Sequence, residues 1–434
     1  MTPMTAPPDT LTIVGPRPLR GRIRAPGDKG ISHRALLCGA LANGTTRITG
    51  LAPGDDVART RAALEALGVT VIGTGDAVAV TGRAGALREP DAVVDCGNSG
   101  TTLRMVAGLV AAHPFLTVLT GDASLRARPM ARVAEPLRAL GATVDGRADG
   151  SLAPLAVRGA RLQGTRCELA VASGQVKTAV LLAGIQADGV TEVVEPAPSR
   201  DHTERMLGAL GAPLEQVDDT TVRVRRGALD GFELEVPGDP SSAAFLVVAA
   251  CVTPGSSLVV TDVALNPRRL GFVEVLQSMG ARIEVCPTGE RLGEPVGDLA
   301  VEAAPLTGTT FTPGEGIIDE VPALAVAAAF AEGTTEIRGA PELRVKESDR
   351  VATLTQELEQ LGIGVEGRPD GLVVTGGAPR AATLKSHGDH RIALAAAVAA
   401  NACDGESTVR GFAAVGASYP GFAADLASVT GGGP

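Results

Sequence analysis

The sequence predicts an α/β protein of two domains, each built from three copies of a strand–helix–strand–helix–strand–strand unit. Three observations predict this fold. The chain of 434 residues is too long for one ordinary hydrophobic core. A helix that stops at a short turn and leads into a strand recurs six times, at intervals of about 70 residues. An amphipathic helix and two further strands follow most of these copies.

The first helix of each unit is expected to be buried, because its sequence is apolar nearly all round. LANGTTRITG (41–50) and FAEGTTEIRG (330–339) show how closely two copies repeat the end of this helix and the next strand. Self-similarity at a fixed period indicates repeated supersecondary units. The six helices are expected to begin near Lys29, Asn98, Ser173, Asp239, Asp319 and Gly388.

The second half of the unit is most complete in RTRAALEALGVTVIGTGDAVAVTG (59–82), and VATLTQELEQLGIGVEGRPDGLVVTG (351–376) repeats it. The last copy, after Gly388, is truncated and ends near FAADLASVTGG (422–432); LTIVGPRPLRG (11–21) is available to supply its missing strand. Three units per domain then predict a first domain at 21–237 and a second at 1–20 plus 238–434, with two chain crossings.

Composition excludes several classes of function. The net charge of −10 argues against a nucleic-acid-binding or anionic-membrane surface, but a local cation cluster can still bind small anions. The six cysteines lack metal-type spacing and are expected to be reduced and buried. The first ten residues lack a signal-peptide pattern, and apolar runs such as ALAVAAAFA (323–331) are too short to span a bilayer. We expect a soluble cytoplasmic protein.

The starts of the six helices are rich in charge and small polar groups: GDKGISHR, GNSGTT, SGQVK, GDPSS, IDEVP and HGDHR. Asp, Ser and Asn are good N-caps, so each start taken alone is more simply explained as a cap. Lys29, Arg34, Lys177 and Arg391, however, sit in or beside first turns, where a cation opposes the helix dipole. Anionic ligands would resolve that conflict. The pattern therefore favours a site for phosphates and carboxylates.

Seven motifs resemble those of the 5-enolpyruvylshikimate-3-phosphate synthase family, in order and over nearly the whole chain. They are PGDKGISHRAL (26–36), CGNSGTTLRM (96–105), LRARPMAR (125–132), SGQVKTA (173–179), SRDHTERM (199–206), LRVKESDR (343–350) and GDHRIAL (388–394). The SGQVK and RPMAR forms are similar to the branch sometimes called class II. The resemblance implies a two-domain inside-out α/β barrel of six βαβαββ units, three per domain around buried parallel helices.

The resemblance also implies a reaction. The enolpyruvyl group of phosphoenolpyruvate passes to the 5-hydroxyl of shikimate 3-phosphate, and phosphate leaves after a tetrahedral intermediate. This step belongs to the shikimate pathway, which leads to chorismate and the aromatic amino acids. No metal or other cofactor is implied, and a monomer is expected. The herbicide glyphosate occupies the enolpyruvate region in this family.

Site residues are implied by position. Asp319 and Glu347 match the family's acid/base pair, and Lys29 matches a lysine that touches both substrates and takes part in catalysis. The positions matching the phosphoenolpyruvate site are Lys29, Gly100, Arg128, Gln175, Arg350 and Arg391. The positions matching the shikimate 3-phosphate site are Lys29, Gly30, Arg34, Ser173, Gly174, Gln175, Arg200, Asp319 and Lys346. Arginine suits such sites because its planar fork binds carboxylate and phosphate bidentately.

Two departures from the family pattern stand out. Gly30 replaces the serine of most members, and Ala417 replaces a lysine found in many. At Gly30 two explanations are open: a missing hydroxyl, or a backbone with positive φ that requires glycine. His387 and His390 have i, i+3 spacing, but no third ligand cluster accompanies them, so we expect no metal site. His390 matches the family histidine beside the enolpyruvyl group.

Two alternatives remain at this point. The UDP-N-acetylglucosamine enolpyruvyl transferases share the fold, but that family carries a cysteine on a mobile loop, and HPFLTVLTGDASLRARP (113–129) has none. A non-catalytic repeat protein that binds anions is the second alternative. It predicts no release of phosphate from phosphoenolpyruvate and shikimate 3-phosphate.

Overall fold

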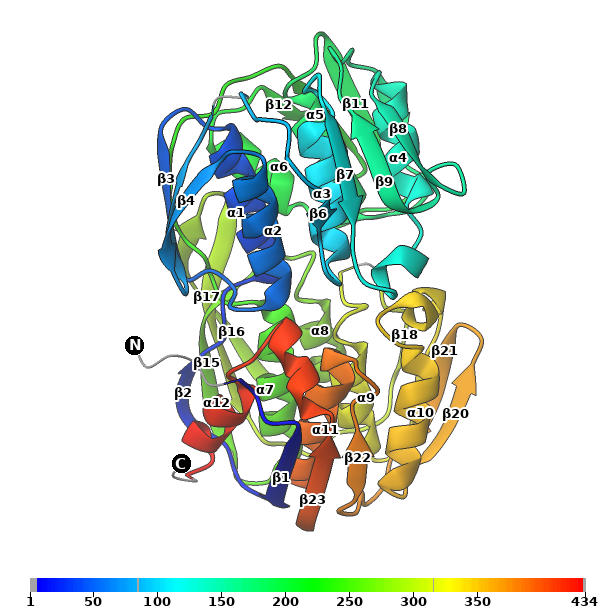
Figure 1. The fold of residues 1–434 in the computed structure, drawn as a ribbon. Coiled ribbons are helices and arrows are strands. Elements are labelled where there is room, and N and C mark those ends of the chain that lie inside the picture. The colour runs from blue at the N-terminus through cyan, green and yellow to red at the C-terminus, as the bar shows by residue number, and fades with distance from the viewer. Residues whose placement is uncertain (1–5, 84–85, 315, 432–434) are drawn as a thin grey trace. The chain divides into compact units, whose positions relative to one another are not determined.

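The computed structural model describes residues 6–83, 86–314 and 316–431, and the chain divides into two compact units (Figure 1). The unit that we call the inserted unit comprises Gly27–Val236 and Glu290–Glu294. The terminal unit comprises Met1–Pro26, Pro237–Gly289 and Pro295–Pro434. The first ten residues were expected to lack a signal peptide. Of these, residues 1–5 lie outside the part of the chain that the structure describes.

The inserted unit contains three repeats of the predicted pattern. The first consists of β14 (Glu233–Glu235), α1 (Lys29–Leu41), β3 (Thr45–Thr49), α2 (Asp55–Ala66), β4 (Thr70–Thr74) and β5 (Ala77–Thr81). The second consists of β6 (Val94–Asp95), α3 (Gly100–Val110), β7 (Leu116–Thr120), η1 (Leu125–Ala127), α4 (Ala131–Ala139), β8 (Thr143–Arg147) and β9 (Leu152–Arg158). The third consists of β10 (Arg166–Glu168), α5 (Gly174–Gly184), β11 (Val190–Val194), α6 (His202–Ala209), β12 (Leu214–Gln216) and β13 (Thr221–Arg225).

The terminal unit repeats the pattern three more times. Its first repeat consists of β2 (Arg20–Arg24), α7 (Pro240–Val252), β15 (Ser257–Ala264), α8 (Gly271–Ser278), β16 (Arg282–Arg291) and β17 (Glu294–Glu302). The second consists of β18 (Thr310–Phe311), α9 (Val321–Ala329), β19 (Thr334–Ile337), η2 (Pro341–Val345), α10 (Arg350–Gln360), β20 (Gly364–Arg368) and β21 (Gly371–Thr375). The third consists of β22 (Thr383–Lys385), α11 (His390–Ala402), β23 (Gly405–Arg410), η3 (Phe412–Ala417), α12 (Phe422–Val429) and β1 (Thr10–Gly15).

Each repeat has its own sheet; in the described part of the chain five of these sheets have four strands in the same order, and the sheet of the last repeat has three. In β14-β3-β5-β4, for example, β14 and β3 are parallel, and the other neighbours are antiparallel. The orders β6-β7-β9-β8, β10-β11-β13-β12 and β18-β19-β21-β20 follow the same rule. The sheets stay separate, and none closes into a barrel in the described part of the chain. The predicted fold of six repeats is therefore confirmed.

The truncated last repeat takes its final strand from the beginning of the chain, as the sequence predicted. Strand β1 pairs antiparallel with β23, from Thr10 opposite Arg410 to Gly15 opposite Gly405. Strand β22 lies parallel on the other side of β23. Residues 10–15 and 383–410 therefore complete one sheet.

One feature of the topology was not predicted, namely an exchange of strands where the chain passes from one unit to the other near residues 26 and 236. Strand β2 precedes α1 along the chain but pairs with β15 of the terminal unit, from Arg20 opposite Ser257 onward. Strand β14 precedes α7 but pairs with β3 of the inserted unit, from Glu233 opposite Arg47 onward. Residues 21–26, which the sequence had placed in the first domain, consequently lie in the terminal unit.

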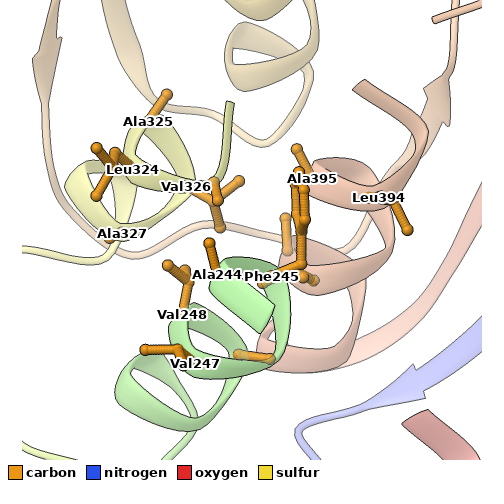
Figure 2. Close-up of a cluster of buried hydrophobic side chains, with 14 of the residues drawn as sticks. Ala244, Phe245, Val247, Val248, Leu324, Ala325, Val326, Ala327, Leu394 and Ala395 are labelled. Atoms are coloured by element: carbon orange, nitrogen blue, oxygen red, sulfur yellow. The ribbon is translucent and has the colours of Figure 1, made fainter. Parts of the chain in front are cut away.

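The core of the terminal unit is formed by three helices that the sequence predicted to be buried, α7, α9 and α11. They contact one another pairwise, and side chains such as Phe245, Val248, Val326 and Ala395 lie close together between them (Figure 2). Their many alanines leave little side-chain bulk between the helix axes. Because these helices are apolar nearly all round, they are buried on every face.

Helices α1, α3 and α5 have the same role in the inserted unit, and one glycine shows how closely they pack. A Cβ at Gly108 of α3 would lie 2.5 Å from the Cα of Ala179 in α5. Only glycine permits that approach of two backbones. Close packing of this kind holds α3 against α5, and candidate site residues lie at the N-terminal ends of these two helices.

Candidate functional site

Arg350 organises the candidate residues of the terminal unit. Its side chain is 1% exposed and holds Asp389, the N-cap of α11, in a two-pronged ion pair: Nε donates to Oδ2 (2.9 Å) and Nη2 to Oδ1 (3.3 Å). Nη2 also donates to Glu347 Oε2 (2.8 Å), and Nη1 donates to Asp319 Oδ1 (3.4 Å). The two carboxylates predicted to perform acid/base chemistry thus lie around one guanidinium.

The charges of this cluster stabilise one another. Burial alone would lower the pKa of Arg350, but Asp389, Glu347 and Asp319 together raise it, so the guanidinium stays protonated. Burial alone would raise the pKa of Asp389, but Arg350 and His390 together outweigh burial, and the pKa falls below its usual value. Breaking such a buried pair by removing one partner leaves an uncompensated charge and costs about 3–5 kcal/mol.

Asp319 is not the helix cap that its position in the sequence allowed. Helix α9 begins at Val321, and Glu320 occupies the N-cap position. The Asp319 carboxylate instead accepts hydrogen bonds from Arg350 and from Lys346 Nζ, the latter also at 3.4 Å. The side chains of Asp319 and Glu347 are 22% and 23% exposed, so both remain accessible to a small molecule.

Arg391 is a buried cation with unmet hydrogen-bonding capacity. It is 3% exposed, and its guanidinium carbon lies 5.9 Å from the centre of the Phe245 ring. Its Nε and Nη1 have no hydrogen-bond partner among the described residues. An unpaired buried donor on a charged group is costly, and an anion on Arg391 would remove that cost. Its location in the first turn of α11 adds the helix dipole to the same preference.

The two histidines near Arg391 have different surroundings. His387 Nε2 lies 2.6 Å from Glu357 Oε1 of α10, which ties the β22–α11 connection to that helix. His390 is the first residue of α11 and is buried. Among the described residues there is no group of three or more His, Cys, Asp or Glu side chains arranged to hold a metal ion. Ala417, the other departure from the family pattern, ends η3 in the same unit.

Arg34 ties together the helix starts of the inserted unit. From inside α1 it donates to Thr203 Oγ1 (2.6 Å), Thr178 Oγ1 (2.8 Å) and the carbonyls of Gly30 (2.9 Å) and Gly174 (3.1 Å). The N-terminal ends of α1 and α5 therefore adjoin each other and α6. Gly174, a candidate residue for shikimate 3-phosphate, is held at this junction.

Two more candidate residues flank that junction. Ser173 is the N-cap of α5 and accepts a hydrogen bond from Val176 N at 3.4 Å. Arg200 precedes α6 and lies beside the start of α5, since a Cβ on Gly174 would be 3.2 Å from the Cβ of Arg200. Ser173, Gly174 and Arg200 thus form one patch with the backbone of a helix start, which is a suitable seat for a phosphate.

Gly30 is the second residue of α1 and does not have a positive φ. The explanation that the backbone requires glycine is therefore wrong. An added Cβ would lie 3.2 Å from Arg34 Nη1, 3.2 Å from Asp28 Oδ1 and 3.7 Å from His202 Cδ2. These contacts are tight but involve the ends of side chains. The explanation that a hydroxyl is missing here stays a prediction.

Gln175 lies at the junction of α5 and α3. Its Oε1 accepts from Arg104 Nη1 (2.7 Å), and its Nε2 donates to Thr101 Oγ1 (3.0 Å). Arg104 also donates to the carbonyl of Pro129 (3.1 Å). Sequence reasoning did not single out Arg104, although a buried arginine within the apolar helix that follows GNSGTT was a visible signal. It fixes the orientation of Gln175.

Gly100 and Arg128 lie together at the start of α3. A Cβ on Gly100 would be 2.9 Å from Arg104 Nη1 and 3.5 Å from Arg128 Nη1. Arg128 Nη2 donates to Asn98 Oδ1 (2.6 Å). Asn98, like Arg104, was not among the site residues predicted from the sequence. Glycine at position 100 therefore leaves room beside two guanidinium groups.

Lys29 opens α1 and is held by an acidic side chain of α2, since its Nζ lies 3.0 Å from Asp56 Oδ2. The sequence did not identify Asp56 as a partner of Lys29, because acidic residues are common in the first turn of a helix, where the helix dipole favours them.

His33, one turn further along α1, is buried, and burial lowers its pKa to about 3. The neutral ring pairs through Nδ1 with Thr60 Oγ1 (2.7 Å).

The prediction that Lys177 faces an anionic ligand is wrong. Its position near the start of α5 had suggested an anionic ligand. Instead its Nζ lies 2.6 Å from Glu195 Oε2 and 2.7 Å from Glu204 Oε1, with all three side chains buried. Burial raises the pKa of Glu204, and Lys177 offsets only part of that increase. The conflict with the helix dipole is thus resolved within the protein.

Comparisons with known proteins identify the family to which the chain is similar. The family model described as EPSP synthase (3-phosphoshikimate 1-carboxyvinyltransferase) matches residues 13–426. A 3-phosphoshikimate 1-carboxyvinyltransferase of a Synechococcus strain is 52% identical, with 94% of this chain and 95% of the relative covered. The corresponding protein of Desulforudis audaxviator is 50% identical, with 97% and 99% covered.

Solved structures give the same result. A structure of EPSP synthase from Acinetobacter baumannii is similar with a TM-score of 0.86 and 38% identity, covering 96% of this chain and 97% of that one. The enolpyruvyl transferase NikO from Streptomyces tendae has a TM-score of 0.78 at 22% identity, with 98% of both chains covered, and shows a shared fold. In the described residues no helix is both long and apolar enough to cross a membrane.

Proposed function

The chain belongs to the EPSP synthase family, and from that membership we propose that it transfers the enolpyruvyl group of phosphoenolpyruvate to the 5-hydroxyl of shikimate 3-phosphate. The observation that carries the proposal is the arrangement of Asp319 and Glu347 around Arg350. Two partly exposed carboxyl groups beside a fixed cation can serve the proton transfers that this reaction requires at the 5-hydroxyl oxygen and at C3.

The first half of the reaction is an addition. The 5-hydroxyl loses its proton to the Asp319 carboxylate, and its oxygen forms a bond to C2 of phosphoenolpyruvate. At the same time C3 takes a proton from the carboxylic acid form of Glu347, which turns the CH₂ group into a methyl group. The product is a tetrahedral intermediate in which C2 carries the carboxylate, the phosphate, the methyl group and the new ether oxygen.

The second half is an elimination. The Glu347 carboxylate takes a proton from the methyl group, the electrons of that C–H bond form the C2–C3 double bond, and the C–O bond to phosphate breaks. The phosphate leaves with the electron pair of that bond and accepts the proton held by Asp319. Both carboxyl groups thus return to their starting states, and one enolpyruvyl ether and one inorganic phosphate are formed.

Cations hold the reacting groups against their mutual repulsion. We assign Arg391, Arg350, Arg128 and Gln175 to phosphoenolpyruvate, with Gly100 leaving space for it. We assign to shikimate 3-phosphate Gly30, Arg34, Ser173, Gly174, Gln175, Arg200, Asp319 and Lys346. Lys29 is assigned to both substrates. The unpaired Nε and Nη1 of Arg391 support its assignment, because an anion would supply the partners that the described residues do not.

Arg34 has a different part in this assignment. Four of its hydrogen bonds go to protein groups, so it acts mainly by fixing Gly30 and Gly174 at the helix starts. The action of a single cytoplasmic monomer without a cofactor stays a prediction of the family resemblance.

The experiment that tests the function is a phosphate-release assay with phosphoenolpyruvate and a second substrate. We expect continuous release with shikimate 3-phosphate, and none with UDP-N-acetylglucosamine or with no acceptor. Release with the nucleotide sugar would support the other enolpyruvyl transferase activity. Absence of release with either acceptor would favour a non-catalytic protein and contradict the proposal.

A further inference from the structure

Four buried polar side chains of the terminal unit form a cluster that the proposed mechanism does not use. Arg269, in the connection between β15 and α8, is 2% exposed. Its Nη2 donates to Asp239 Oδ1 (3.0 Å) and to Ser241 Oγ (2.8 Å), and lies 3.9 Å from Glu320 Oε1. The Ser241 hydroxyl in turn donates to Glu320 Oε1. One guanidinium thus connects the N-cap aspartate of α7 with the glutamate at the N-cap position of α9.

Glu320 directly follows Asp319 in the chain. Contacts that hold Glu320 in place therefore also restrict the position of Asp319. The backbone of Glu320 is fixed by a hydrogen bond from its N to the carbonyl of Ile317 (3.1 Å), and by one from Leu324 N to its carbonyl (3.0 Å). The Asp319 carboxylate receives bonds of 3.4 Å, at the long end of the range for a hydrogen bond. Asp319 lies on the turn that Glu320 anchors, so a shift of that turn would move the Asp319 side chain.

The next repeat of the terminal unit contains an equivalent arrangement around Arg350. Arg350, at the start of α10, reaches Asp319 just before α9 and Asp389 at the N-cap of α11. Arg269, shortly before α8, reaches Asp239 at the N-cap of α7 and Glu320 at the start of α9. In both repeats an arginine near the start of the second helix connects the N-terminal ends of two buried helices. Arg269 is thus the counterpart of Arg350.

We propose that Arg269 is a positioning residue for the reaction, which acts through Glu320 on the Asp319 carboxylate. This proposal rests on the proposed function, because it assumes that Asp319 accepts the hydroxyl proton. A small displacement of a reacting group lowers the rate strongly, by about 100-fold for about 1 Å. The expected signature is a loss of kcat with little change in KM, because Arg269 contacts neither substrate in this assignment.

The primary variant is Arg269→Gln, with Arg269→Lys as the conservative comparison. We expect Arg269→Gln to lower kcat about 10- to 100-fold and to change each KM less than about threefold. Arg269→Lys keeps a charge between the two carboxylates and should recover part of the lost kcat. Because an unpaired buried carboxylate could destabilise Arg269→Gln, the double variant Arg269→Gln/Glu320→Gln removes one such charge. It should regain stability but not kcat.

Two further measurements test whether Arg269 only stabilises the fold. Asn401→Ala is the matched control: Asn401 is a buried residue of α11 whose Nδ2 donates to the carbonyl of Arg17 (3.0 Å), and it has no part in the cluster. It should lower Tm without lowering the kcat of the folded protein. The decisive measurement repeats Arg269→Gln in the Asp319→Asn background. If Arg269 acts through Asp319, the second substitution should lower kcat less than about twofold further.

The outcomes separate the two proposals. Equal fold-losses from Arg269→Gln in both backgrounds would overturn the positioning role, while Asp319 would keep its proposed role. Normal turnover by Asp319→Asn alone would overturn the role of Asp319 and the positioning role with it. A loss of kcat by Asn401→Ala equal to that of Arg269→Gln at matched Tm would show that general destabilisation accounts for the effect, and would also overturn the positioning role.

Discussion

Arg350 and Asp389 lie 39 residues apart in the sequence and form a two-pronged ion pair in which both side chains are almost fully buried. The pair joins the start of α10 to the N-cap of α11. The same guanidinium reaches Glu347 and Asp319. One buried ion pair of the terminal unit and the predicted acid/base residues therefore share one side chain.

This pair should make stability depend on pH in the acid range. The folded-state pKa of Asp389 lies below its unfolded value, so its stabilising contribution is present above the unfolded pKa and is lost as the pH falls through the folded one. Asp389→Asn should therefore weaken the decline in unfolding free energy as the pH falls below about 5. Urea unfolding at several pH values measures this, and an unchanged decline would contradict the account.

The buried cluster of Lys177 should behave in the opposite sense. The folded-state pKa of Glu204 is raised by burial, so its contribution is fully present below the unfolded pKa and is lost as the pH rises through the folded one. Glu204→Gln keeps an acceptor for Lys177 and should be at least as stable as the parent at pH 8, with a smaller difference at pH 4. Lys177→Met leaves two buried carboxylates and should cost about 3–5 kcal/mol.

The control for this prediction is turnover. Lys177 and its partners are occupied by one another and have no proposed contact with substrate. The kcat of folded Glu204→Gln should therefore match that of the parent. A large loss of kcat in that variant, at temperatures where it is fully folded, would return Lys177 to the list of ligand-binding candidates.

Gly30→Ser tests the missing hydroxyl at the start of α1. Because φ at this position is not positive, serine should fold without backbone strain. A restored hydrogen bond to a charged substrate group, about 1.5 kcal/mol, would lower KM for shikimate 3-phosphate by up to about tenfold. Gly30→Ala is the matched control and should leave that KM unchanged. A marked drop in Tm in both variants would show that the contacts at 3.2 Å cannot relax.

Gly100→Ala tests the space beside Arg104 and Arg128. The added methyl would lie 2.9 Å from Arg104 Nη1, so that side chain must shift and its bond to Gln175 must change. We expect weaker inhibition by glyphosate and a higher KM for phosphoenolpyruvate, with KM for shikimate 3-phosphate less affected. Inhibition constants for parent and variant check this. Equal constants would remove the steric argument.

The sequence predicted what is local and periodic. The buried helices follow from their all-round apolar composition, and the repeat follows from six similar segments. Pairing of β1 with β23 was also predicted, because the last copy visibly lacked a strand. The exchange of β2 and β14 was not, because each strand pairs far along the chain and its own sequence does not mark its partner.

Side-chain partners were predicted less well than backbone elements. The sequence identified Lys177 as a cation near a helix start but did not show that Glu195 and Glu204 would meet it. Arg104 and Arg269 were not singled out, because a buried arginine is recognised by partners that only the fold brings together. The positions around Arg350 were supplied by the resemblance to a family rather than by periodicity or spacing.

The central claim is that Asp319 and Glu347 transfer the protons of the reaction, and turnover of their isosteric variants tests it most directly. At saturating phosphoenolpyruvate and shikimate 3-phosphate, Asp319→Asn and Glu347→Gln should each lose about 10²–10⁴-fold in kcat. Each should still bind shikimate 3-phosphate with a Kd within about tenfold of the parent, because geometry is preserved. Near-normal kcat in both variants would contradict the account.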